Sequence, residues 1–123
     1  MAILVTGGTG FVGSNIVRTL AQQGYTVICF DLVPPDELLQ QYIGAWAGKV
    51  TFVQGDILNQ HDLDTFAGTD ITRIVHAAVF TGVLPEVEVQ QSRDIVGINV
   101  MGTTNMLELA SRLPLERFLY VSS

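Results

Sequence analysis

Glycines stand at positions 7, 10 and 13, where a short apolar run gives way to a helical pattern that begins at Phe11. A helix N-terminus can bind a pyrophosphate, because its first backbone N–H groups are free and the helix dipole is positive there. Glycines let that backbone come close to the phosphates. We predict that Gly7 makes the tight turn, Gly10 admits the phosphate, and Gly13 lets the helix contact the strand. A tight turn without a ligand is the alternative.

One carboxylate, Asp31, follows the second apolar run, residues 26–30, and lies 18 residues after Gly13. In dinucleotide-binding units an acidic residue about 20 positions past the glycines accepts hydrogen bonds from the adenosine ribose. Its charge also repels a 2′-phosphate, so the sequence predicts NAD rather than NADP as the cofactor. The acidic pair Asp36 and Glu37 favours the same choice. Further residues predicted to contact the cofactor here are Phe11, Val12 and Leu32.

Apolar runs with strand character alternate with helical patterns along the chain. The five runs cover residues 3–6, 25–30, 49–54, 71–76 and 115–121. The second run, residues 25–30, is continuously apolar rather than alternating, which is typical of a strand covered on both faces in a parallel sheet. The sequence therefore predicts one α/β domain over residues 1–123, a doubly wound parallel sheet (Rossmann) with the strand order 3-2-1-4-5.

The longest helical pattern covers residues 88–113 and carries two apolar stripes. Met106 and Leu109 belong to the first stripe, whereas Val100 and Leu107 belong to the second. Two apolar stripes imply two covered faces. We expect one face to pack on the sheet and the other to be available for a partner helix.

Composition excludes several classes of partner. The net charge of −6 and an isoelectric point near 4.5 argue against nucleic acid or an anionic membrane surface. The single cysteine, Cys29, lies in an apolar run, so we expect a core residue and no disulfide. No apolar run reaches the roughly 18 residues of a membrane span, and the first strand begins too early to leave room for a signal peptide. We expect a cytoplasmic protein with no metal site.

Residues 6–13 have the spacing T-G-x-x-G-x-x-G. This pattern resembles the fingerprint of the extended short-chain dehydrogenase/reductase family, the NAD-dependent sugar epimerases and dehydratases. Residues 99–105, which read N-V-x-G-T-x-N, match a second run of that family. The resemblance covers the whole chain but only the N-terminal portion of the family. It implies an NAD cofactor, a nucleotide-sugar substrate, and a homodimer through the helix over 88–113.

The resemblance also assigns the end of the third apolar run to the adenine. The carboxylate of Asp56 would accept a hydrogen bond from the exocyclic amine, and the backbone of Ile57 would contact the edge of the ring. In the alternative interpretation, Asp56 caps the helix expected to begin near Asn59. The two roles are compatible.

The fourth apolar run ends in His76, Ala77 and Ala78. The matching stretch of the family lies across the pyrophosphate and ribose, where small side chains let the backbone approach. For His76 we favour a structural hydrogen-bonding role over a catalytic one. The resemblance gives Asn99 a mainly structural role beside the cofactor, and it makes Thr81 a minor candidate contact.

The family's active-site pair, Tyr-x-x-x-Lys, does not occur in these 123 residues, because the single lysine, Lys49, has Ala45 at that spacing. In the family the tyrosine exchanges a proton with the substrate, and the lysine lowers its pKa. The resemblance leaves Ser123 as the catalytic hydroxyl that binds the substrate oxygen, with Ser122 as a second choice. We interpret Tyr120 as a core residue.

We therefore predict the cofactor-binding portion of an NAD-dependent nucleotide-sugar epimerase or dehydratase, truncated at the catalytic serine, that binds NAD but is inactive alone. Residues 118–121 would form an apolar edge strand that needs a cover, which favours this interpretation. An NAD(P)-dependent reductase or a hydroxysteroid-type dehydrogenase of the same superfamily is nearly as compatible. A non-catalytic dinucleotide-binding module is the remaining alternative.

Overall fold

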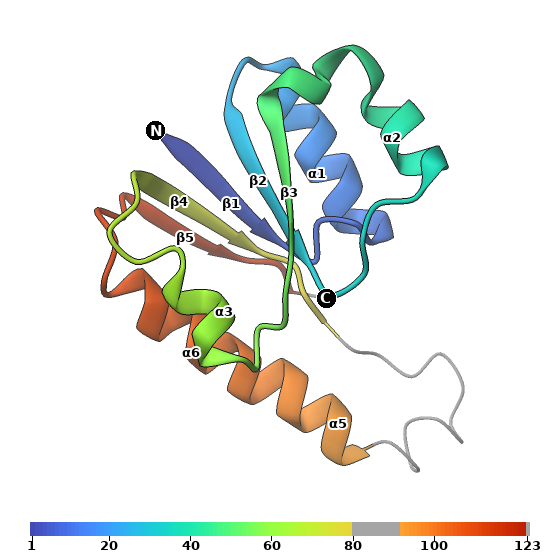
Figure 1. The fold of residues 1–123 in the computed structure, drawn as a ribbon. Helices are drawn as coiled ribbons and strands as arrows, with labels where there is room; N and C mark the ends of the chain where they lie inside the picture. The colour runs from blue at the N-terminus through green and yellow to red at the C-terminus, as the bar shows by residue number, and fades with distance from the viewer. Residues whose placement is uncertain (80–91, 123) are drawn as a thin grey trace.

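The computed structural model describes residues 1–79 and 92–122, and its centre is a five-stranded parallel sheet (Figure 1). The strand order is β3-β2-β1-β4-β5, and every neighbouring pair is parallel. The predicted doubly wound α/β fold with the order 3-2-1-4-5 is confirmed. The strands are β1 (Ala2–Thr6), β2 (Thr26–Asp31), β3 (Val50–Gln54), β4 (Ile71–His76) and β5 (Arg117–Tyr120).

The central strand, β1, fixes where the loops meet. All five of its residues are buried, as expected for a strand covered on both faces. Its last residue, Thr6, pairs with Phe30 of β2 on one side and with His76 of β4 on the other. The loops that follow these three strands therefore leave the sheet side by side at its carboxyl edge.

Helices cover both faces of the sheet (Figure 1). One core cluster joins α1 and α2 to the sheet through Val17 and Leu39, and the other joins α3 and α6 through Leu63 and Met106. The helical segments are α1 (Phe11–Gln22), α2 (Glu37–Ile43), η1 (Gly44–Lys49), α3 (Gln60–Asp64), α5 (Ser92–Val96), η2 (Gly97–Met101) and α6 (Gly102–Ala110). No helix in the described ranges combines the length and apolar character that crossing a membrane requires.

Local sequence signals account for the ends of the first helices. Gly24, just after α1, has φ +91°, a left-handed conformation that glycine adopts without strain. Asp36 caps α2 by accepting a hydrogen bond from the Leu39 N–H at 2.8 Å. Leu39 and Ile43 are buried, whereas Leu38 is 76% exposed. Only the i, i+4 pair faces the sheet.

The helix predicted over residues 88–113 ends earlier than expected and contains a π-helical segment. Residues 88–91 lie outside the described residues, and the described part consists of α5, the π-helical segment η2, and α6, which ends at Ala110. A π-turn adds one residue to a helical turn, and apolar periodicity does not reveal this. The chain turns over residues 111–114 before β5.

The two apolar stripes of this helical stretch differ in burial. Met106 and Leu109 are fully buried, which confirms that the first stripe packs on the sheet. Val96, Val100 and Leu107 are each more than half exposed. The second stripe therefore remains open, and its partner helix stays a prediction.

The edge strand, β5, is less buried than its apolar sequence predicts. Tyr120 is 50% exposed, so the expectation of a core residue was wrong; within the described residues, β5 has a paired strand, β4, on one side alone. Cys29 in β2 is 1% exposed, and burial raises the pKa of its thiol to about 12. The prediction of a core cysteine is confirmed.

Candidate functional site

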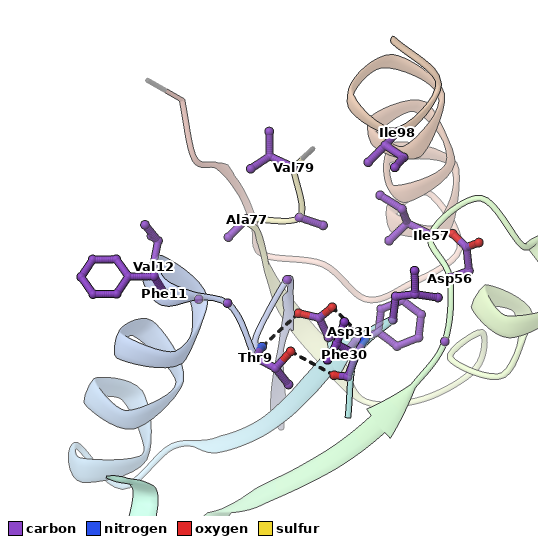
Figure 2. A pocket seen from close by; sticks show the side chains of 17 residues that line it. Thr9, Phe11, Val12, Phe30, Asp31, Asp56, Ile57, Ala77, Val79 and Ile98 are labelled. Atoms are coloured by element: carbon purple, nitrogen blue, oxygen red, sulfur yellow. Dashed lines mark hydrogen bonds between the residues drawn. The ribbon is translucent and has the colours of Figure 1, made fainter. Parts of the chain in front are cut away.

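A cavity of about 620 Å³ opens at the carboxyl edge of the sheet (Figure 2). Its wall is formed by the loops that follow β1 to β4, the first residues of α1, and one residue of η2. Parallel α/β sheets bind ligands at this edge, outside the carboxyl ends of the strands. The lining residues are Gly7, Thr9, Gly10, Phe11, Val12, Gly13, Phe30, Asp31, Leu32, Val33, Gly55, Asp56, Ile57, Ala77, Ala78, Val79 and Ile98.

The glycine turn leaves no room for side chains at two of its three predicted positions. Gly7 has φ +67°, and a β-carbon there would lie 2.8 Å from the backbone nitrogen of Ala78. A β-carbon on Gly13 would lie 2.0 Å from the carbonyl oxygen of Gly7. The tight turn predicted for Gly7 is confirmed, and Gly13 allows α1 to pack directly against the turn.

The N-terminus of α1 is open at the cavity. Its N-cap, Gly10, provides no side-chain acceptor, and the first turn contains no acidic residue. The first N–H groups of a helix have no intrahelical acceptor, so they carry the positive end of the helix dipole. Phe11 and Val12, which line the cavity at this end, are 88% and 51% exposed. An anion at this point would meet backbone donors rather than side chains.

Asp31 lines the cavity with its carboxylate held at both oxygens (Figure 2). Oδ2 accepts a hydrogen bond from the Thr9 N–H at 3.0 Å, and Oδ1 accepts one from the Val33 N–H at 3.2 Å. An ionised carboxylate has about four lone-pair sites. Each oxygen therefore retains acceptor capacity for a hydroxyl group in the cavity.

The loop after β3 places Asp56 and Ile57 on the wall of the cavity across from Phe11 and Val12 (Figure 2). Asp56 Oδ1 accepts a hydrogen bond from the Leu58 N–H at 2.9 Å, which closes a turn before α3. The helix cap is Asn59, whose Oδ1 accepts from the N–H groups of His61 and Asp62. The alternative in which Asp56 caps this helix was therefore wrong.

The position of Ile57 depends on a helix that is distant in the sequence. Its carbonyl oxygen accepts a hydrogen bond from Asn105 Nδ2 of α6 at 2.9 Å. Asn105 is 7% exposed, and its Oδ1 accepts a second bond from Gln60 Nε2 at 2.8 Å. The wall at Ile57 is thus fixed to both α3 and α6.

His76 lies beneath the cavity rather than in its wall. Its Nδ1 contacts Thr6 Oγ1 at 2.6 Å, and this hydroxyl also accepts hydrogen bonds from the N–H groups of Ala77 and Ala78. With both lone pairs used, Thr6 donates its own proton to Nδ1. His76 Nε2 consequently carries the proton and donates to Thr103 Oγ1 at 3.0 Å.

This network requires a neutral imidazole. His76 is 2% exposed, and burial lowers its pKa below the ordinary histidine value. The Thr103 hydroxyl in turn donates a hydrogen bond to the carbonyl oxygen of Asn99 at 2.7 Å. The arrangement joins the Ala77–Ala78 floor of the cavity to η2, which agrees with the structural role favoured for His76.

The structure brings together the predicted cofactor residues with two exceptions. His76 and Asn99 do not line the cavity, and Ser123 and Thr81 lie outside the described residues. Some lining residues were not predicted from the sequence. Two of them could have been found from their neighbours, because Thr9 lies among the predicted glycines and Phe30 directly precedes Asp31. The missed lining residues are Thr9, Phe30, Val33, Gly55, Val79 and Ile98.

The model of the NAD-dependent epimerase/dehydratase family matches residues 3–123. The chain belongs to this family. The family and the order of the sheet agree with what the sequence resemblance implied.

Members of the family with different activities are similar to the chain. A 3-beta-hydroxysteroid dehydrogenase of Mycolicibacterium neoaurum is 35% identical over 123 residues, which cover 98% of this chain and 31% of that protein. The structure of an epimerase from Methanothermobacter thermautotrophicus matches with a TM-score of 0.84 at 31% identity, over 99% of this chain and 35% of that one.

A UDP-glucose-4-epimerase from Stenotrophomonas maltophila was solved with bound NAD and formylated UDP-arabinopyranose. It matches with a TM-score of 0.83 at 27% identity, over 100% of this chain and 37% of that one. The chain spans about a third of the length of each of these relatives.

Proposed function

We propose that the chain binds NAD in the cavity at the carboxyl edge and is the cofactor-binding part of an NAD-dependent epimerase or dehydratase that acts on a nucleotide sugar. The observation that carries this proposal is the glycine turn at the open N-terminus of α1, with Asp31 beside it. The pyrophosphate would lie against Gly10 and the first N–H groups of α1. The adenosine ribose would bind Asp31.

The residues present fit such a cofactor. A cavity of about 620 Å³ is within the range of small-molecule sites. Asp56 and Ile57 would hold the adenine, and the methyl side chains of Ala77 and Ala78 leave the backbone of their loop accessible beside Gly7. Related structures of this fold contain bound NAD.

NAD, when bound, supplies hydride chemistry by accepting a hydride from a substrate carbon and, in an epimerase or dehydratase, returning it. The residues of this chain bind and orient the dinucleotide. Ser123 would hydrogen-bond the substrate oxygen. The sequence has no Tyr-x-x-x-Lys pair to transfer the proton, so we propose that these 123 residues bind NAD without turning over a sugar.

A hydroxysteroid dehydrogenase is the second candidate for the whole protein. The observation in its favour is the 35% identity to a 3-beta-hydroxysteroid dehydrogenase. Both candidates use the same cofactor site and differ in the substrate. The open stripe of Val96, Val100 and Leu107 on α5, η2 and α6 is the proposed homodimer surface in either case.

We expect the purified chain to bind NADH and to leave UDP-glucose unchanged. Binding follows from the glycine turn and Asp31, and the lack of turnover follows from the missing Tyr-Lys pair. NADH fluorescence titration measures the first, and chromatography of the nucleotide sugar after incubation with NAD measures the second. Absence of NADH binding would refute the cofactor proposal, whereas epimerised UDP-glucose would refute only the claim of inactivity.

We expect Asp31→Ala to remove the preference for NADH over NADPH. Loss of the charged acceptor should weaken NADH binding about tenfold, because hydrogen bonds to charged groups are the stronger ones. NADPH binding should not weaken, since a repulsive charge near its 2′-phosphate is also lost. Asp64→Ala is the matched control, because that exposed carboxylate pairs with Arg112 away from the cavity. Equal NADH/NADPH ratios in Asp31→Ala and wild type would contradict the ribose assignment.

A further inference from the structure

Thr9 connects the glycine turn to the loop after β2 through two hydrogen bonds. Its N–H donates to Asp31 Oδ2 and its hydroxyl donates to the carbonyl oxygen of Val33, each at 3.0 Å. Figure 2 shows Thr9 beside Asp31 with these bonds drawn. Because Thr9 stands between two glycines, Gly8 and Gly10, it carries the side chain that can form hydrogen bonds in this part of the turn.

Together with a third hydrogen bond, from the Val33 N–H, these two bonds close a ring around the Asp31 carboxylate. Oδ2 accepts from the Thr9 N–H, and Oδ1 accepts from the Val33 N–H at 3.2 Å. The Thr9 hydroxyl then joins Thr9 directly to Val33. The Thr9 hydroxyl is thus a side-chain link between the two backbone segments that donate to the carboxylate; a backbone hydrogen bond from the Gly8 N–H to the carbonyl oxygen of Phe30, at 3.4 Å, also joins the turn to β2.

The backbone at the end of β2 is also held by residues at the end of β3. The Gly55 N–H donates to the carbonyl oxygen of Asp31 at 2.9 Å, and Gln54 Nε2 donates to that of Leu32 at 3.2 Å. These bonds fix the backbone of residues 31 and 32 but do not reach the Asp31 side chain. The direction of the carboxylate depends on Thr9 and Val33.

An aspartate side chain has several staggered rotamers to choose from. In the rotamer that the ring holds, both carboxylate oxygens keep acceptor capacity and the side chain lines the cavity. A carboxylate that rotates away would lose its hydrogen bonds to a ribose. It would also repel a 2′-phosphate less, because the repulsion falls with distance.

We propose that the Thr9 hydroxyl is a positioning and specificity-determining group. By bonding to Val33 it holds Asp31 toward the adenosine ribose, and it thereby sets part of the preference for NAD over NADP. The inference rests on the proposed function, NAD binding with the ribose at Asp31.

The test compares Thr9→Val, Thr9→Ser and wild type by fluorescence titration with NADH and with NADPH. Valine keeps the shape and the backbone N–H but removes the hydroxyl, so the NADH/NADPH affinity ratio should fall about fivefold, the value of one neutral hydrogen bond. Serine should restore the ratio. Thr104→Val is the matched control, because it removes an exposed hydroxyl of α6 that donates to the carbonyl oxygen of Val100 in η2 at 2.9 Å, outside the cavity lining.

The same substitution in the Asp31→Ala background separates positioning from a general structural role. If Thr9 acts through Asp31, Thr9→Val should leave the ratio of Asp31→Ala unchanged. A wild-type ratio in Thr9→Val, or an equal fall of the ratio in both backgrounds, would overturn the role of Thr9 while NADH binding by the wild type stands. A wild-type chain that does not bind NADH would overturn the proposed function and this inference together.

Discussion

Replacing Gly13 with alanine is expected to abolish NADH binding and to lower the free energy of unfolding by about 2 kcal/mol. A β-carbon at this position would lie 2.0 Å from the carbonyl oxygen of Gly7 and 2.9 Å from Cα of Gly8. Both neighbours are backbone, so no side-chain rotation relieves the clash, and α1 must move away from the turn. That movement separates the helix N-terminus from the glycines with which it forms the phosphate site.

NADH fluorescence titration and urea unfolding measure the two effects separately. Gly48→Ala is the matched control, because a β-carbon at that position in η1 would meet nothing within 4 Å. The control should bind NADH like the wild type and unfold at no lower urea concentration. If Gly13→Ala binds NADH with wild-type affinity, the pyrophosphate does not occupy this turn and the cofactor site has been assigned to the wrong place.

The fold could be predicted because strong local signals agreed with one topology. β1 is a nearly continuous apolar run in the sequence and is buried in the centre of the sheet. Glycines marked the ends of β1 and α1, and the alternation of strands with helices left few ways to order a parallel sheet. The misjudged parts are those where burial depends on neighbours distant in the sequence. The edge position of β5 was predicted, but Tyr120 was still expected in the core; it is half exposed because the burial of an edge-strand side chain depends on what covers that edge.

In the candidate site, likewise, some residues could be predicted from the sequence, whereas the contacts that hold them could not. Gly7, Gly13 and Asp31 could be predicted, because phosphate approach and ribose binding demand particular residue types at particular intervals. The contacts that hold these residues could not, since any hydroxyl or amide in a loop is an eligible partner. The Thr9 bond to Val33 and the bridge from Thr6 through His76 to Thr103 join segments that are far apart in the chain.

Replacing Asn105 with alanine is expected to lower the free energy of unfolding by about 2 kcal/mol, because a buried hydrogen bond is lost and its partner is left unsatisfied. The partner is the carbonyl oxygen of Ile57, which Asn105 Nδ2 contacts at 2.9 Å. The loop that carries Ile57 and Asp56 would then be free to shift from α6. We therefore expect weaker NADH binding as well, measured by fluorescence titration at a temperature where the variant is folded.

Two further variants identify the bond responsible. Gln60→Ala removes the donor to Asn105 Oδ1 but keeps the bond to Ile57, so it should cost under about 1 kcal/mol and leave NADH affinity unchanged. Asn105→Asp keeps the acceptor for Gln60 but places a carboxylate oxygen against the Ile57 carbonyl, so it should be at least as harmful as alanine. If Asn105→Ala and Gln60→Ala behaved alike, the amide would serve only to join α3 to α6. If they differ as expected, helix α6 does more than cover the sheet, because it also fixes the wall proposed to hold the adenine.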